Sequence, residues 1–354
     1  MTQTYRPGVY SRYQVTYSGT SKLPKTGIFC CGTQKQTGAA VEQYVPVKIE
    51  NESCLEELFT KEENPRLWRL ALLWLEQGVG LWLLPATVDG SQPEEADYAA
   101  ALAKAQEIKD AACLLCDSGE EQVLLEVKAA VEQALRQQRE WLGFGFCSAS
   151  DAPGLAAALN SERMVLCCQK ASAAQGEEGD ALFTCAAFAA RILALSAPND
   201  SLSGLPLPGI GAVEALGETE VEALLAAGVT VFEEIGGAVE CICGVTTKTK
   251  AQGGEDRSLG AITTVLMIDH VMQAVRARLK GLLQSIRTDR YTLGAIETQA
   301  AVALGEEQDL GLVESFQSPQ ASRDKENPST CHVLLRFALA VVVSQIWITA
   351  EITV

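Results

Sequence analysis

Histidine is nearly absent from this chain, and positive charge is scarce. Its 354 residues include 2 histidines, and 28 lysines and arginines stand against 45 aspartates and glutamates. Because metal sites and general acid–base sites so often use histidine, few such schemes remain open. The formal net charge of −17 disfavours a nucleic-acid groove or an anionic membrane surface. We expect an acidic outer surface and no direct nucleic-acid or membrane partner.

Long hydrophobic runs are also missing. Residues 1–7 run into polar sequence without the apolar core of a secretory signal. The most apolar window, residues 333–348, carries Arg336, Ser344 and Gln345 and alternates with a period of two, which disfavours a membrane-spanning helix. The sequence therefore predicts a soluble protein made in the cytoplasm.

Most of the 12 cysteines lie in apolar stretches. Two adjacent pairs are Cys30-Cys31 and Cys167-Cys168. Adjacent residues of a strand point to opposite faces, so neither pair is suited to holding one ion. Cys113 and Cys116 have the spacing of a redox or zinc pair, but on a strand they too would face opposite sides. We predict buried free thiols and no metal site.

Strand-like and helix-like segments alternate in strict succession from about residue 98 to residue 196. This order predicts crossover connections, a largely parallel sheet and helices on its faces, which is an α/β fold. The expected strands are residues 26–32, 81–85, 112–116, 142–146 and 164–168. The expected helices are residues 67–76, 98–109, 120–141, 152–159 and 182–195. A polar stretch at 89–97 predicts a boundary.

The later part of the chain has a different pattern. After a Pro/Gly-rich loop at 197–211, Thr219 and Glu222 predict a capping box for a short helix that ends at Gly228. Gly236-Gly237 predicts the turn of a hairpin. Further expectations are a helix over 262–287, a helix over 292–304 and a flexible link over 315–330. The long helix should bury a stripe made of Ile268, Met272, Val275, Leu279, Leu282 and Ile286.

Both ends of the chain read as exposed, apolar strands. The carboxy-terminal strands alternate in period two, with a first strand beginning near Val333. The residues expected to face a partner are Val9, Tyr13, Val15, Tyr17, Ile346, Ile348, Ile352 and Val354. Because an unpaired strand recruits another chain through its backbone, we predict two arms that add strands to neighbouring molecules, as in a polymer subunit.

Chemistry-bearing motifs are weak throughout. The glycine motif begun by Gly209 and Gly211 has Glu214 where a dinucleotide loop needs its third glycine, and no Walker phosphate loop occurs. The competing hypothesis is a cytoplasmic α/β enzyme with a site at Cys147 or near Asp117, but no base for Cys147 is identifiable. We expect no catalytic, cofactor-binding or metal-binding residues.

Several segments together resemble contractile tail sheath proteins. Residues 205–248 have the family's proline/glycine loop, short helix, glycine-centred hairpin and closing pair of threonines. The remaining matching segments are Arg6-Pro-Gly-Val-Tyr10, Leu159-Asn-Ser-Glu-Arg163, Arg257-Ser-Leu and Ile268-Asp269-His-Val271. The match spans nearly the whole chain, although many phage sheaths carry outer domains for which this chain has little room.

This resemblance implies an α/β sheath body with extended strand arms and no enzymatic activity. It implies a homopolymer of stacked, sixfold rings around an inner tail tube, bounded by baseplate and tail-terminator proteins. Assembly would occur in the bacterial cytoplasm, and the sheath would belong to a virion, a bacteriocin or another released contractile particle. The long helix would lie near the tube, where Arg276, Lys280 and Arg287 form a basic row. The expected divisions are 1–20, 21–88, 89–200, 201–314 and 315–354.

Overall fold

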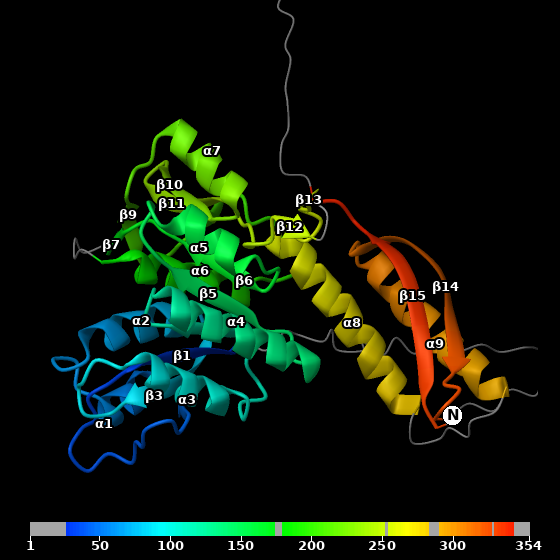
Figure 1. The fold of residues 1–354 in the computed structure, drawn as a ribbon, viewed down its shortest axis with the longest axis horizontal. Coiled ribbons are helices and arrows are strands. Elements are labelled where there is room, and N and C mark those ends of the chain that lie inside the picture. Colours follow the sequence, from blue (N-terminus) through cyan, green and yellow to red (C-terminus); the bar gives the residue numbers. More distant parts are fainter. Residues whose placement is uncertain (1–25, 174–178, 252–253, 283–289, 328, 343–354) are drawn as a thin grey trace, which may run out of the picture.

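The structure is a computed structural model that describes residues 26–173, 179–251, 254–282, 290–327 and 329–342. Arg287 and the eight residues expected to face a partner in the two arms lie outside these ranges. The described chain forms an α/β body and a smaller lobe, and one long helix runs from the body into the lobe (Figure 1). We call these parts the body and the lobe.

A six-stranded sheet forms the centre of the body. Its strand order is β2-β3-β1-β4-β5-β6, and all neighbours are parallel except β2 and β3. The strands are β1 (Thr26–Gly32), β2 (Val47–Ile49), β3 (Gly80–Thr87), β4 (Cys113–Cys116), β5 (Leu142–Phe146) and β6 (Met164–Cys167). The predicted, largely parallel sheet is confirmed. Because β1 and β3 join the same sheet as β4, the chain on either side of residue 89 shares one sheet.

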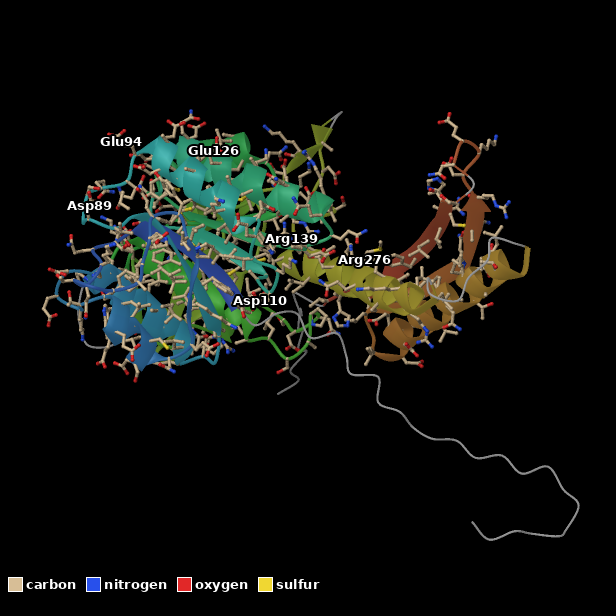
Figure 2. All side chains as sticks on the ribbon, turned by 90° about the horizontal axis from the view of Figure 1, so that it is seen from below. Asp89, Glu94, Asp110, Glu126, Arg139 and Arg276 are labelled. Carbon is tan, nitrogen blue, oxygen red and sulfur yellow. The ribbon has the colours of Figure 1, made fainter. Side chains whose placement is uncertain are left out.

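Helices cover both faces of this sheet and create two apolar cores. One face carries α1 (Glu52–Leu58), α2 (Pro65–Leu75) and α6 (Ala181–Leu193). The other face carries α3 (Glu95–Ala105), α4 (Glu121–Arg136) and α5 (Ala152–Leu159). Asp89, Glu94 and Glu126 project into solvent from the body (Figure 2), as the acidic composition predicts.

The cysteines follow the alternation of the strands. Cys30 lies in the core beneath α3 and α4, and its neighbour Cys31 lies in the core beneath α2 and α6. Cys113 and Cys116 divide between the two cores in the same way. All twelve cysteines lie in the described residues as free thiols; eight are buried as predicted, whereas Cys54, Cys147, Cys243 and Cys331 are half-buried.

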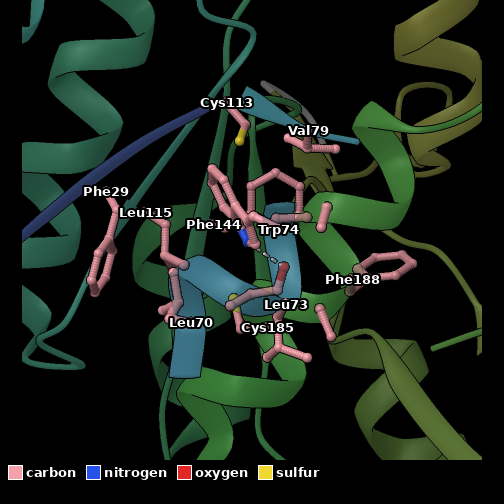
Figure 3. Packing of buried hydrophobic residues seen from close by; sticks show 14 of the residues in the cluster. Phe29, Leu70, Leu73, Trp74, Val79, Cys113, Leu115, Phe144, Cys185 and Phe188 are labelled. Atoms are coloured by element: carbon pink, nitrogen blue, oxygen red, sulfur yellow. Dashed lines mark hydrogen bonds between the residues drawn. The ribbon is translucent and has the colours of Figure 1, made fainter. Parts of the chain in front are cut away.

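Trp74 fills the space between the sheet and α6 (Figure 3). Its side chain is fully buried, and its indole Nε1 donates a hydrogen bond of 2.8 Å to the carbonyl of Ala186 in α6. The ring lies directly over β1, because a Cβ at Gly27 would come within 2.3 Å of it. Gly27 is therefore the residue that allows this close approach.

A second group of short elements packs beside β6. It contains β7 (Ala171–Ala173), β8 (Leu205–Pro206), β9 (Ile210–Val213), α7 (Glu218–Ala227), β10 (Val231–Ile235), β11 (Ala238–Cys243), β12 (Lys250–Ala251) and β13 (Gly254–Glu255). The predicted hairpin is confirmed, since β10 and β11 pair in antiparallel fashion across Gly236 and Gly237, both with positive φ. The predicted capping box is wrong: α7 begins at Glu218 with Gly217 as its N-cap, so Thr219 already lies inside the first turn.

The lobe consists of α8 (Ile262–Leu282), α9 (Arg290–Asp309) and a hairpin of β14 (Val313–Arg323) and β15 (Cys331–Leu339). Residues 313–323 form a strand, so the flexible link predicted over 315–330 is wrong for most of its length. The sequence pattern did not indicate this strand because its exposed positions are polar. Pro319 also lies where the pairing register with β15 shifts, between Gln317 and Gln320. The predicted alternation in β15 is confirmed.

The predicted stripe of α8 is confirmed at Val275 and, as a half-buried residue, at Leu279, but it is displaced by one residue nearer the start of the helix; Ile286 lies outside the described residues. Met267, Val271 and Val275 are buried in the lobe, whereas Ile268 and Met272 are half-buried. The difference arises because the start of α8 packs against the body, whereas the rest of α8 packs against α9. The buried residues therefore lie on two different faces of the helix.

Replacing Trp74 with alanine should lower the free energy of unfolding by about 3–5 kcal/mol, because it empties a core site and removes the indole's hydrogen bond to the Ala186 carbonyl. Urea denaturation monitored by circular dichroism measures this change. Trp82→Ala is the control, since Trp82 is half-buried and its indole pairs with exposed Asp110. Equal losses for the two variants would contradict the assignment of Trp74 as the central core residue.

Candidate functional site

The junction between the body and the lobe is held by a buried ion pair. Arg163, immediately before β6, donates two hydrogen bonds of 2.5 and 2.6 Å to the two carboxylate oxygens of Asp269 on α8. Only 7% and 4% of their side-chain surfaces are exposed. This bidentate geometry fixes both the position and the rotation of α8 against the edge of the sheet.

The electrostatics make the two charges depend on each other. Burial raises the pKa of Asp269, while the hydrogen bonds and charge of Arg163 act in the opposite direction. An isolated charge at this depth would lose its hydration with nothing to replace it. Arg163 therefore opposes the protonation of Asp269 that burial favours, and removal of either group leaves the other buried without its partner.

A second polar contact lies farther along α8. Glu140, in the turn between α4 and β5, accepts hydrogen bonds from Gln273 at 3.0 Å and from the guanidinium of Arg276. The Glu140 side chain is 5% exposed and that of Arg276 is 31% exposed. Figure 2 labels Arg276 on α8. Sequence reasoning missed Glu140, because a single acidic residue before Trp141 carries no periodic signal.

The segment before Arg163 is tied to the strand region after the β10–β11 hairpin. The backbone N–H of Ser161 donates to the Thr247 hydroxyl at 3.0 Å, and the backbone N–H of Thr247 donates to the Met164 carbonyl at 2.8 Å. Asn160 ends α5 in the left-handed conformation and accepts hydrogen bonds from two backbone N–H groups, those of Thr249 and Lys250. The junction therefore joins three distant stretches of sequence: 160–164, 247–250 and 269–276.

The three residues predicted to form a basic row have different positions. Arg276 is engaged by Glu140, Lys280 is exposed on α8, and Arg287 lies outside the described residues. Nearby Arg278 pairs with Glu306 and Gln299 on α9. An arrangement of these residues toward a tube stays a prediction.

The two positions of the enzyme hypothesis lie at the carboxyl ends of strands. The Asp117 carboxylate accepts hydrogen bonds from the Tyr98 hydroxyl at 2.5 Å and the Gly32 N–H at 3.1 Å, beside a hollow of about 200 Å³. Burial raises the pKa of Asp117, and it raises the pKa of Cys147 to about 12. Cys147 is therefore a thiol near neutral pH and a poor nucleophile. The histidines are in the lobe, near Glu307 and Asp324.

Across the described ranges, no group of three or more His, Cys, Asp or Glu side chains is placed to hold a metal ion. No helix in this part of the chain is both long and apolar enough to cross a membrane.

Comparison with solved structures places this architecture among tail sheath proteins. No family model and no curated protein matches the chain. A chain in the baseplate of the anti-feeding prophage covers 99% of this chain, with all of its own length matched, at a TM-score of 0.74 and 13% identity. A chain of that particle's contracted helical sheath gives 0.71 and 13%, with 99% of both chains covered. The sheath tail protein of Listeria innocua gives 0.69 and 13%, over 89% of this chain and 92% of its own.

The chain has the tail sheath fold. The sheath resemblance of the sequence is thus matched by the three-dimensional arrangement over nearly the whole length. The segments that carried the resemblance also meet in space, because Arg163, Thr247 and Asp269 belong to three of them and all lie at the junction.

Asp269→Ala should destabilise this sheath fold by about 3–5 kcal/mol, because it leaves the Arg163 charge buried without a partner. Urea unfolding of the purified chain measures the loss. The matched control is Arg163→Met combined with Asp269→Leu, which removes both charges and should recover most of the stability. A double variant as unstable as Asp269→Ala would contradict the assignment of the loss to an unpaired charge.

Proposed function

We propose that this chain is a structural subunit of a contractile tail sheath. It polymerises as stacked, sixfold rings around an inner tube, and contraction of the lattice drives the tube through a target envelope. The observation that carries the proposal is the coverage of the fold likeness, which includes the body, the junction and the lobe and extends to a chain of a contracted helical sheath. The subunit acts through assembly and performs no enzymatic step.

The hairpin of the lobe supports assembly by strand addition. β14 and β15 form a two-stranded sheet, and no other strand in the described parts of the chain pairs with either outer edge. One face of this hairpin packs on α9 and α8, which leaves its edges available to a neighbour. We assign residues 1–20 and 343–354 as the arms that supply such strands, through Val9 to Tyr17 and Ile346 to Val354.

The partners follow from this role. Copies of the chain bind one another, the inner face binds the tube protein, and the ends of the polymer meet baseplate and tail-terminator proteins. Assembly takes place in the bacterial cytoplasm, after which the sheath forms part of a virion or a released contractile particle. Lys280 and Arg287, with Arg276 nearby, form the basic row that faces the tube.

Deleting residues 343–354 should leave the body and lobe folded but abolish polymerisation, because the neighbour's sheet loses its added strand. Negative-stain electron microscopy measures the number and length of the polymers, and circular dichroism checks that the chain is folded. A second variant, Ile348→Pro with Ile352→Pro, keeps the length while removing two backbone donors, and it should also fail to polymerise. Sheath tubes of normal length from either folded variant would falsify the role of the arm.

Reversing the basic row should weaken binding to the tube while sparing the sheath itself. The variant is Lys280→Glu with Arg287→Glu; Arg276 is kept because a glutamate there would face Glu140. Each exposed pair contributes about 0.2–1 kcal/mol, and repetition around the rings multiplies the effect. Co-sedimentation with tubes at low salt measures it, where repulsion is least screened. Lys325→Glu, on the exposed end of the hairpin, is the control and should bind normally. Equal tube binding by the double variant and this control would contradict the assignment.

A further inference from the structure

The lobe contains a buried histidine–glutamate pair that the sheath function does not require. His270 on α8 and Glu307 on α9 are 9% and 6% exposed, and His270 Nε2 lies 3.5 Å from Glu307 Oε2. This separation is too long for a good hydrogen bond, and Oε2 has no hydrogen-bond partner among the described residues. A buried carboxylate oxygen without a hydrogen-bond partner lowers the stability of the lobe. A proton shared between His270 and Glu307 would remove this cost by forming a hydrogen bond.

Among the described residues, no other charged group packed around the pair is placed to neutralise Glu307. On α8, the neighbouring Asp269 is engaged by Arg163, and on α9, Glu306 is engaged by Arg278. The packed core on either side is apolar, with Met267, Val271, Leu304 and Leu312 buried. The charged residues of β14 and β15 take exposed positions: Glu314, Arg323, His332 and Arg336. His270 is therefore the group that determines the state of Glu307.

We propose that His270 and Glu307 form a proton-operated latch between α8 and α9, closed by one shared proton in mildly acidic solution and opened by its loss in alkaline solution. With one proton present, either the acid donates to the neutral ring or the imidazolium donates to the carboxylate. A movement of less than about 1 Å closes the present gap to the length of a charge-assisted hydrogen bond. Without that proton, a buried carboxylate faces a neutral ring and α8–α9 packing weakens.

The direction of the pH dependence follows from the two groups. Burial raises the pKa of Glu307 from 4.5 to about 7, so its contribution to stability is complete below 4.5 and is lost as the pH rises through 7. Burial lowers the pKa of His270, so a second proton is disfavoured and destabilises the lobe only in more acidic solution. The latch therefore loosens between about pH 6 and 8. This inference concerns the folded monomer and stands apart from the sheath proposal.

Glu307→Gln tests the latch, because glutamine keeps the size and the hydrogen-bonding atoms but cannot ionise. Differential scanning calorimetry of the full chain from pH 5.5 to 8.5 should show the wild-type melting temperature falling with pH relative to Glu307→Gln. Glu307→Leu should likewise remove the difference, because it also removes the ionising group, and it provides a second variant if the first fails to fold. Parallel profiles for the wild-type chain and a folded variant would overturn the proposal.

Proton NMR of the imidazoles reports the coupling directly, since the chain has 2 histidines. His332→Asn removes the exposed histidine that pairs with Asp324, so it assigns the remaining signal to His270 and serves as the calorimetric control. Adding Glu307→Gln to this variant should lower the pKa of His270, because the carboxylate that attracts the proton is gone. An unchanged pKa of His270 would show that the two groups do not share a proton, which overturns the latch whether or not the chain forms a sheath.

Discussion

The placement of the lobe against the body depends on the ion pair between Arg163 and Asp269, because this pair joins two parts of the chain that have separate cores. The body buries its apolar residues against the six-stranded sheet, and the lobe buries its own around Met267 and Val271. Apolar packing within each part is non-directional and does not by itself set their relative placement. A buried bidentate arginine–carboxylate pair accepts one geometry only, so it supplies the direction that packing lacks.

The long helix α8 turns this local contact into a fixed arrangement. Its 21 residues span about 32 Å at 1.5 Å per residue, and its backbone hydrogen bonds resist bending over that length. Leu266 packs in the core of the body, and Met267, one residue later, packs in the core of the lobe. Glu140 then holds Gln273 and Arg276 one to two turns farther along. The contacts with Arg163 and with Glu140, at two points along this rigid helix, therefore fix the direction of its axis relative to the body.

The sequence predicted the features that depend on the local pattern of residues. It did not predict the features that depend on contacts between residues far apart in the chain. The buried strands of the sheet and the division of Cys30 and Cys31 between two faces follow from a period of two, which each segment carries by itself. The β14 strand was missed because only one of its faces packs, and its other positions are polar. Glu140 was missed because its role comes from meeting Arg276, which is more than a hundred residues away. The first part of the α8 stripe, at Ile268 and Met272, was misplaced by one residue for the same reason, since the start of the helix packs against both the body and the lobe.

The junction was still partly visible in the sequence, through the segments that resemble tail sheath proteins. Where those segments meet, Arg163, Thr247 and Asp269 hold the body edge, the loop after the β10–β11 hairpin and α8 together. Under the proposed function, a subunit that works by assembly needs its edges held at a fixed angle. Buried polar contacts with one allowed geometry, such as the Arg163–Asp269 pair, supply that angle.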